Sequence, residues 1–326
     1  MLVLAIQDEK DKHMFLPSKT ALLSLFVVAT ALSGTMSAHA ATLATRFNPS
    51  QFLNGTAPNV GNATLDNTGY VVCYDTFCSM DSAATKGAVW SAEHLTAQQV
   101  ANARGASRKS MTFFSDPHIP AAASARTGDY TRSGYDRGHM APWADSADPN
   151  CFTLANIVPQ NPDNNRHLWE GIETSTREMA SKYGEVYVVS GPIFEGKNST
   201  RINGVVVPDG LYKAVYVPSM HVATAYVVRN APGYWWKPVS INDVINMTHT
   251  DPFPALPASY KAQVTTPVYP NMHGKIIPPG DASETPENNN MTDSGHQSSY
   301  EQPMHNMAHT FMRHMERSAM YKLFGH

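Results

Sequence analysis

The sequence of 326 residues has little charge, few cysteines and only one marked apolar run. Charged residues make up 16% of the chain and leave a formal net charge of −3. This is not the composition of a strongly basic nucleic-acid-binding protein, although an acidic total still allows a local basic groove. The three cysteines include no CxxC pair, which argues against a zinc ribbon. No internal repeat is visible. With 42% hydrophobic residues, a substantial core can form.

The apolar run lies near the N-terminus, over residues 21–34, and is too short to span a bilayer. Lys19 precedes it, and the small-x-small pattern "AHA" at 38–40 follows it, as at a signal-peptide cleavage site. We therefore expect residues 1–40 to be a removed export signal. The mature protein is then expected to be secreted or periplasmic, without a membrane span. The alternative is a buried N-terminal helix.

Export would place the cysteines in an oxidising compartment, where disulfides form. Cys73 and Cys78 are close enough in sequence to close a small loop, which would leave Cys151 buried or free. Three cysteines allow three single pairings, so the sequence favours this assignment without fixing it.

Composition divides the chain into four parts. Residues 41–68 are polar and rich in Asn, Thr and Gly, and we expect a flexible lead-in. Residues 69–266 have the sequence pattern of one globular domain, with short β-rich runs separated by turn residues. Residues 267–326 begin with the composition of a disordered Pro/Asn/Ser-rich linker and end in a Met/His-rich tail. We expect the tail to be a dispensable extension, with metal or partner binding as the alternative.

Short runs rich in Val and Tyr predict strands within the 69–266 domain. The clearest runs are "GYVVCYDTF", "AVWSAEHL", "EVYVVSGPIF", "NGVVVP", "LYKAVYVP" and "VATAYVV". A helix is predicted to begin after Thr96 and to end at Gly105, and another to begin after Ser240, because Thr and Ser are N-cap residues.

The segment "YDRGHMAPWAD" at 135–145 places a histidine in a polar run that is neither a core strand nor an apolar-periodic helix. Histidine is the commonest side chain for taking a proton from water near neutral pH. Beside His139, we expect Gly138 to let the backbone bend sharply. Arg137 offers a planar fork for phosphate oxygens. Asp136 is expected to brace the loop or to pair with a neighbouring arginine.

A helical pattern begins at about Asn164, after a strand-like run "FTLANIV" and a turn "QNPDNN". Successive i+4 positions then form a slowly winding stripe along one side of the helix, made of Asn165, Trp169, Glu173 and Arg177. Each member also has a structural explanation. Glu173 and Arg177 could be a surface ion pair, Asn165 could cap the helix, and Trp169 fits a core position.

Together these segments give the order strand, histidine loop, strand, and helix with an asparagine in its first turn. In this order and in its motifs, the chain resembles the DNA/RNA non-specific endonuclease family, which includes secreted sugar-nonspecific nucleases and endonuclease G. The matching blocks are "DRGH" at 136–139, continued by "MAP", and "NIVPQ" at 156–160. Asn165, Glu173 and Arg177 follow at the family's spacing. The resemblance covers roughly residues 69–260.

The resemblance implies an α+β fold with a mixed, mainly antiparallel β-sheet core flanked by helices and containing a ββα-metal finger. It also implies a metal-dependent endonuclease that hydrolyses DNA and RNA with little sequence specificity and leaves 5′-phosphate ends. The expected partners are therefore DNA and RNA substrates. A homodimer and a dedicated inhibitor protein are left open.

The resemblance assigns the proton transfer to His139 and the metal to Asn165. His139 would be the general base that activates water for attack on phosphorus. Asn165 would be the direct ligand of one divalent cation, Mg²⁺ in the first place with Mn²⁺ as an alternative. Glu173 would hold metal-bound water.

The remaining carried-over residues concern charge and orientation. Arg137 and Arg177 would offset the charge that grows on the phosphate oxygens. Asn156 would orient the histidine loop or the substrate. Arg108 in "SRKSMTFFSDP" is displaced by a few residues from the family's upstream arginine, and it is expected to bind substrate. Lys213 in "LYKAVY" is a further expected substrate contact.

Three other functions compete with this one. A nucleic-acid-binding or protein-binding module on the same fold, with weak or no catalysis, is disfavoured because both His139 and Asn165 are present. An exported metal-handling protein would use the Met/His-rich tail. A phosphodiesterase of small molecules would cleave nucleotide diesters in place of polymers.

Overall fold

The computed structural model describes residues 41–196, 200–265 and 268–280. The chain separates into two units, residues 1–38 and residues 39–326, and every described residue belongs to the second. The predicted export signal and the Met/His-rich tail lie outside the described residues. Among the helices that the structure describes, none is long and apolar enough to cross a membrane.

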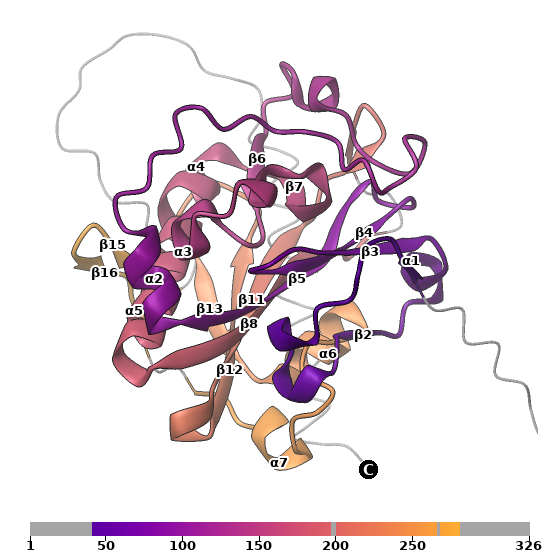
Figure 1. Cartoon of the computed structure of the whole chain (residues 1–326). Helices are drawn as coiled ribbons and strands as arrows, with labels where there is room; N and C mark the ends of the chain where they lie inside the picture. The colour runs from indigo at the N-terminus through magenta and orange to yellow at the C-terminus, as the bar shows by residue number, and fades with distance from the viewer. Residues whose placement is uncertain (1–40, 197–199, 266–267, 281–326) are drawn as a thin grey trace, which may run out of the picture. The chain divides into compact units, whose positions relative to one another are not determined.

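The centre of the fold is one large sheet. Its strands are β1 (Thr42–Leu43), β3 (Gly69–Cys73), β4 (Cys78–Ser82), β5 (Gly87–Thr96), β8 (Glu185–Ile193), β11 (Gly210–Val217), β12 (Val222–Arg229) and β13 (Trp236–Val239). They lie side by side in that same order (Figure 1). Neighbours run antiparallel, except that β1 is parallel to β3. The predicted mainly antiparallel sheet is confirmed.

Helices flank the sheet, as predicted. The long helix α5 (Glu170–Tyr183) packs on one face, and α6 (Ile241–Thr248) packs on the other. The remaining helices are short: α1 (Ala63–Asn67), α2 (Ala97–Ala103), α3 (Trp143–Ser146), α4 (Pro162–Asn164) and α7 (Ala258–Lys261). In Figure 1, α2, α3 and α4 lie on the same side of the sheet as α5.

Four small two-stranded sheets complete the fold. They pair β2 (Asn59–Val60) with β14 (Thr250–Asp251), β6 (Asp136–His139) with β7 (Ile157–Gln160), β9 (Arg201–Ile202) with β10 (Val205–Val206), and β15 (Asn271–Met272) with β16 (Lys275–Ile276). All four pairs are antiparallel.

Alternation along the central strands divides the core in two. On β11, Tyr212 and Ala214 belong to the cluster that includes α6. Leu211 and Val215 belong to the cluster that includes α5. Because side chains alternate between the faces of a strand, Lys213 falls on the α5 face, among the residues of a central strand. A charged side chain is therefore placed under α5.

Both predicted helix caps are present. Thr96 caps α2 in a capping box with Gln99, and Ser240 caps α6 in one with Asp243. These side chains satisfy backbone N–H groups that have no partner within the helix, which is why the two helix starts could be predicted. Gly105, where α2 was predicted to end, lies just beyond the helix with a left-handed φ of +77°.

The segment 41–68 differs from the flexible lead-in that was expected. Its strands β1 and β2 pair with β3 and β14. Asn48 also joins the domain, because its Nδ2 donates to the Tyr74 carbonyl at 2.9 Å. The Asn- and Thr-rich composition suggested a solvated segment, whereas these polar side chains bond to backbone groups of the fold.

Structure also continues into the segment that was predicted to be a disordered linker. The β15–β16 hairpin packs beside α5, where the Asn271 N–H donates to Ser175 Oγ at 3.0 Å. Trp236 Nε1 donates to the Ile277 carbonyl at 3.1 Å. These contacts extend the folded region beyond residue 266. The polar, Pro-rich composition of the segment gave no sign of them.

Cys73 and Cys78 form a disulfide between the facing ends of β3 and β4. Cys151 is free and buried. The pairing that the sequence favoured is confirmed.

Candidate active site

The two family blocks form the strand pair β6–β7. The "DRGH" residues make up β6, and "IVPQ" makes up β7, with His139 facing Ile157 in the register. The chain then enters a helix in three parts: α4, a π-helical turn over Asn165–Trp169, and α5. The sequence predicted a helix from about Asn164 and gave no sign of the π-helical turn within it. π-Helical turns are rare and occur often at functional sites.

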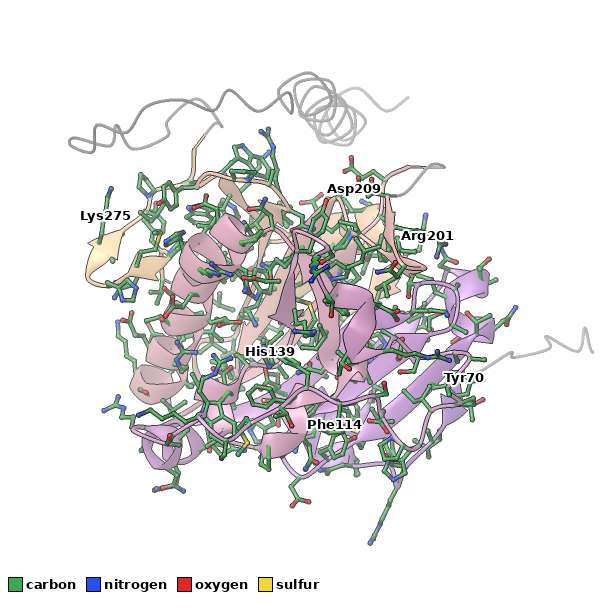
Figure 2. All side chains as sticks on the ribbon, turned by 90° about the horizontal axis from the view of Figure 1, so that it is seen from above. Tyr70, Phe114, His139, Arg201, Asp209 and Lys275 are labelled. Atoms are coloured by element: carbon green, nitrogen blue, oxygen red, sulfur yellow. A yellow bond between two sulfur atoms is a disulfide. The ribbon has the colours of Figure 1, made fainter. Side chains whose placement is uncertain are left out.

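His139 ends β6, and its ring packs against two other aromatic rings. The ring centroids lie 5.3 Å from Phe113 and 5.1 Å from Phe152. Its Nε2 atom is buried without a hydrogen-bond partner among the described residues. Burial, and then the positive charge of Arg108, lower the pKa of His139 to about 3. The imidazole is therefore neutral near pH 7. Figure 2 shows His139 near the centre of the view, with Lys275 and Tyr70 toward opposite edges.

Arg137 lies two residues before His139 and therefore on the same face of β6. Its guanidinium lies 5.2 Å from the Phe113 ring centroid and 5.3 Å from that of Tyr130. One of its nitrogens donates to the Thr127 carbonyl at 2.7 Å. Phe113 thus contacts both the imidazole and the guanidinium, which brings the two predicted residues together.

Arg108 also lies near the imidazole, and its positive charge helps to lower the pKa of His139. It is exposed, and its guanidinium lies 5.6 Å from the centroid of Phe152, the second ring that contacts His139. The displaced arginine is therefore close to the site despite its departure from the family's spacing.

The role of Gly138 differs from the sharp backbone bend that was predicted. Its φ is not among the positive values of the chain's glycines. A Cβ at this position would come within 2.7 Å of the Gln160 Cβ on β7. Glycine is needed here because the neighbouring side chain occupies that space.

Asp136 braces the start of the helix. Its carboxylate accepts a hydrogen bond from Asn165 Nδ2 at 2.9 Å and binds Arg166 at two points, at 2.7 and 2.8 Å. This is the predicted pairing with a neighbouring arginine. The nitrogen of the Asn165 amide thus faces Asp136. The oxygen of the same amide makes no hydrogen bond with the described residues.

Asn156 holds the loop that follows His139. Its side chain is fully buried. The oxygen accepts hydrogen bonds from the Ala141 N–H at 2.9 Å and from Ser91 Oγ at 2.7 Å. The nitrogen donates to the carbonyls of Ala141 at 2.8 Å and Cys151 at 2.9 Å. Of the two roles expected for Asn156, burial leaves orientation of the loop and excludes contact with the substrate.

Charged side chains gather between the sheet and α5: Glu93 on β5, Asp145 on α3, Lys213 on β11, and Glu173 and Arg177 on α5. Arg177 Nη1 donates to Asp145 Oδ1 at 2.8 Å. Burial raises the pKa of Glu173 to about 7, although the charges of Lys213 and Arg177 oppose the rise. Burial also raises the pKa of Glu93, and the charge of Asp145 adds to the rise.

The prediction that Lys213 contacts the substrate is wrong. Its side chain is completely buried. Nζ donates to Ser190 Oγ at 2.7 Å and lies 5.1 Å from the centroid of the Trp169 ring. Its physical role is to supply positive charge beneath the helix, opposite the carboxyl groups of Glu93 and Glu173.

Sequence reasoning missed Glu93 and Asp145. Glu93 was visible as a lone charge in the strand "AVWSAEHL", and Asp145 closes the segment that contains His139. Glu93 approaches Lys213 because β5, β8 and β11 are neighbours in the sheet, and strand order could not be seen in the pattern. Asp145 joins them through its hydrogen bond with Arg177 on α5.

The residues present fit a cation that keeps most of its water. Among the described residues, no group of three or more His, Cys, Asp and Glu could hold a metal ion. The unbonded oxygen of Asn165 is the type of ligand that Mg²⁺ accepts, and Mg²⁺ commonly takes only one or two protein ligands. This donor set does not fit a structural zinc site, which takes four ligands.

The strand pair that ends in a histidine, followed by a helix that begins with an asparagine, defines a ββα-metal finger. The sequence model of the DNA/RNA non-specific endonuclease family matches residues 48–259. The chain therefore belongs to the DNA/RNA non-specific endonuclease family.

Known relatives agree with this assignment. The chain is 38% identical over 164 residues to mitochondrial nuclease EXOG of Danio rerio, covering 44% of this chain and 47% of that protein. It is 34% identical over 185 residues to nuclease C1 of Cunninghamella echinulata var. echinulata, covering 52% of this chain and 71% of that protein. The chain thus spans about half the length of that EXOG protein and more of nuclease C1.

A solved structure is also similar. The crystal structure titled as the EndoG/EndoGI complex, with the mechanism of EndoG inhibition, aligns with a TM-score of 0.52 and 27% identity. The alignment covers 55% of this chain and 84% of that chain.

The predicted secreted or periplasmic location is contradicted by the comparison. Several relatives, including EXOG of Danio rerio and endonuclease G of Homo sapiens, are named as mitochondrial proteins. The prediction rested on the apolar run at 21–34, which lies outside the described residues. A short apolar run followed by small residues is weak evidence for protein localisation when no other signal supports it.

We predict that Asn156→Ala destabilises the fold. The substitution leaves the buried N–H and carbonyl of Ala141 and the carbonyl of Cys151 without partners, which should lower the free energy of unfolding by about 3 kcal/mol. Urea denaturation measures the change. The control is Asn102→Ala, at an exposed amide on α2, which should shift stability by less than about 0.5 kcal/mol. Equal midpoints for the two variants would contradict the role of the amide.

Proposed function

We propose that this protein is a metal-dependent endonuclease that hydrolyses the phosphodiester bonds of DNA and RNA with little sequence specificity and leaves 5′-phosphate ends. The observation that carries the proposal is the neutral, unpaired imidazole of His139, on a strand that is braced to the helix of Asn165. Membership of the endonuclease family supports the reaction class.

His139 is the general base in this proposal. The neutral ring takes a proton from a water molecule as the water oxygen bonds to phosphorus. The bond between phosphorus and the 3′ oxygen then breaks, the phosphate stays on the 5′ end, and the 3′ oxygen takes a proton from solvent. Because Nε2 is buried against aromatic rings, Nδ1 is the nitrogen that accepts the proton. The indole Nε1 of Trp169 donates to the His139 carbonyl at 3.2 Å and so fixes the backbone that carries the imidazole ring.

Asn165 would hold the divalent cation through its side-chain oxygen, with Mg²⁺ preferred and Mn²⁺ as an alternative. The bound ion supplies charge stabilisation at the phosphate and the leaving oxygen. Asp136 orients the amide by accepting its N–H, so that the oxygen faces away from the carboxylate. Glu173 would bind water of the hydrated cation.

Two arginines lie close to the rings that contact the imidazole. Arg137 lies over Phe113 and Arg108 over Phe152, the two rings that contact His139. A phosphate beside the imidazole would meet positive charge from both guanidinium groups, which offsets the charge that develops during attack. Arg177 is bound to Asp145 and Thr174, so we assign it a positioning role beside Glu173.

Low sequence specificity follows when a protein contacts phosphate and sugar in place of base edges. The charged groups around His139 are guanidinium groups, which suit phosphate oxygens. Cleavage of RNA and DNA alike further requires that no group distinguishes the 2′-hydroxyl.

Protein partners form a second part of the proposal. The solved relative is an EndoG in a complex whose title describes inhibition. By analogy we propose a dedicated inhibitor protein for this chain. A homodimer, which the sequence left open, stays untested.

We predict that His139→Ala lowers kcat/KM for phosphodiester cleavage by at least about 10²–10⁴-fold, because general acid–base catalysis contributes that much. DNA affinity and the thermal midpoint should change little. Plasmid cleavage and filter binding measure the two effects. His118→Ala, at an exposed loop histidine, is the control and should keep wild-type turnover. The mechanism fails if His139→Ala turns over substrate at the wild-type rate.

A second prediction concerns pH. Because the pKa of His139 is lowered, the base is unprotonated at neutral pH, and kcat/KM should fall only well below pH 6.5, the ordinary histidine value. Arg108→Ala removes a positive charge that disfavours the imidazolium. The pKa of His139 therefore rises, and the acid limb moves to higher pH.

The pH profile of kcat/KM on an oligonucleotide checks this shift. Lys109→Ala removes the same charge one residue away and is the control, since Lys109 is not among the groups that lower the pKa of His139. An acid limb that moves equally in both variants, or moves to lower pH in Arg108→Ala, would contradict the assignment.

A further inference from the structure

A pocket of about 720 Å³ opens beside the candidate site, between the end of α2, α3 and α5. Its volume lies within the range of ligand sites, about 300–1,000 Å³. Two of its lining residues connect it with the site. The ring of Trp143 lies 5.9 Å from Phe152, which in turn contacts His139. Arg177 belongs to the buried charge cluster under the finger.

Trp143 offers this pocket an apolar ring surface. Its only polar atom, Nε1, already donates to the Ala106 carbonyl at 3.4 Å, which ties α3 to the loop after α2. The side chain is half-buried, so part of the ring remains available to a ligand. A large aromatic surface of this kind is what a nucleobase stacks upon in single-strand-binding proteins.

The charged residues of the pocket suit an anion. Arg104 and Lys182 are exposed at its rim, and Arg177 lines it as well. Glu178 is the acidic residue among the lining side chains of the described chain, and its carboxylate accepts a hydrogen bond from Asn271 Nδ2 at 2.7 Å. The pocket therefore combines a flat apolar surface with a surplus of positive charge.

We propose that this pocket binds one nucleotide of the substrate strand that flanks the scissile phosphate, with its base on Trp143 and its phosphate toward Arg104 and Lys182. This inference rests on the proposed function, because it places the cleaved bond at His139. A base reaches an indole ring only when it is outside a duplex. The pocket therefore favours single-stranded DNA and RNA, or strands that are locally unpaired.

The first test removes single bases from the substrate. A series of single-stranded oligonucleotides with one preferred cleavage point, each with an abasic site at a different position, is cleaved by wild-type protein and by Trp143→Ala. In the wild type, one abasic position near the cleaved bond should raise KM about tenfold, within the range expected for loss of one base–aromatic stack. In Trp143→Ala this position should have no effect, because the stacking partner is already absent.

Trp143→Phe keeps an aromatic ring and guards against a folding defect. It should retain the position-dependent effect of the abasic site, and circular dichroism should show both variants folded. The inference is overturned if Trp143→Ala keeps the wild-type abasic profile, or if no abasic position affects the wild type. Failure of the proposed function looks different: the wild type would then cleave no oligonucleotide, or His139→Ala would cleave as well as the wild type.

A second test uses charge and does not depend on Trp143. Removal of one phosphate contact reduces the slope of log KM against log salt by about 0.7 for a single strand. Arg104→Ala should show this reduction. Lys237→Ala removes an equal charge from an exposed position on β13, outside the pocket lining, and should leave the slope unchanged. Equal slopes for Arg104→Ala and the wild type, or equal reductions in both variants, would contradict the inference.

Discussion

The buried amide of Asn156 joins the loop that follows His139 to the large sheet. Its oxygen binds the large sheet through Ser91 and the histidine loop through Ala141, while its nitrogen binds Ala141 and Cys151. The strands β6 and β7 have only four residues each, and an isolated two-stranded pair of this size is marginal in water. Anchoring to the sheet therefore supplies rigidity that the finger could not have alone.

Buried charged side chains between α5 and the sheet form a second connection between the helix and the sheet. Lys213 and Arg177 lie among the carboxyl groups of Glu93, Asp145 and Glu173, where burial strengthens electrostatic interactions and makes a missing partner costly. The alternation of β11 explains this arrangement, because its other face presents Tyr212, Ala214 and Tyr216 to the cluster that includes α6 and carries no charge. The helix that carries Asn165 at its start is thus fixed at one end by Asp136 and further along by the buried charges.

The local parts of this arrangement could be predicted from the sequence. The "DRGH" and "NIVPQ" blocks, the caps at Thr96 and Ser240 and the Cys73–Cys78 pair all depend on residues close together in the chain. The burial of Lys213 and the approach of Glu93 could not be predicted, because they depend on which strands are neighbours. The role of Gly138 was predicted wrongly because the need for glycine there comes from the side chain of Gln160 on another strand. The ordering of segments 41–68 and 268–280 likewise comes from distant partners that composition does not reveal.

The proposed cleavage of DNA and RNA depends on one histidine and one hydrated divalent cation acting together. Digestion of plasmid DNA and of RNA by the full chain, in Mg²⁺ and then with EDTA, tests it most directly. We expect both polymers to be cut to oligonucleotides with 5′-phosphate ends, EDTA to stop cleavage, and excess Mg²⁺ to restore it. Cleavage that persists at the same rate in EDTA, or no cleavage of either polymer in Mg²⁺, would contradict the proposed mechanism.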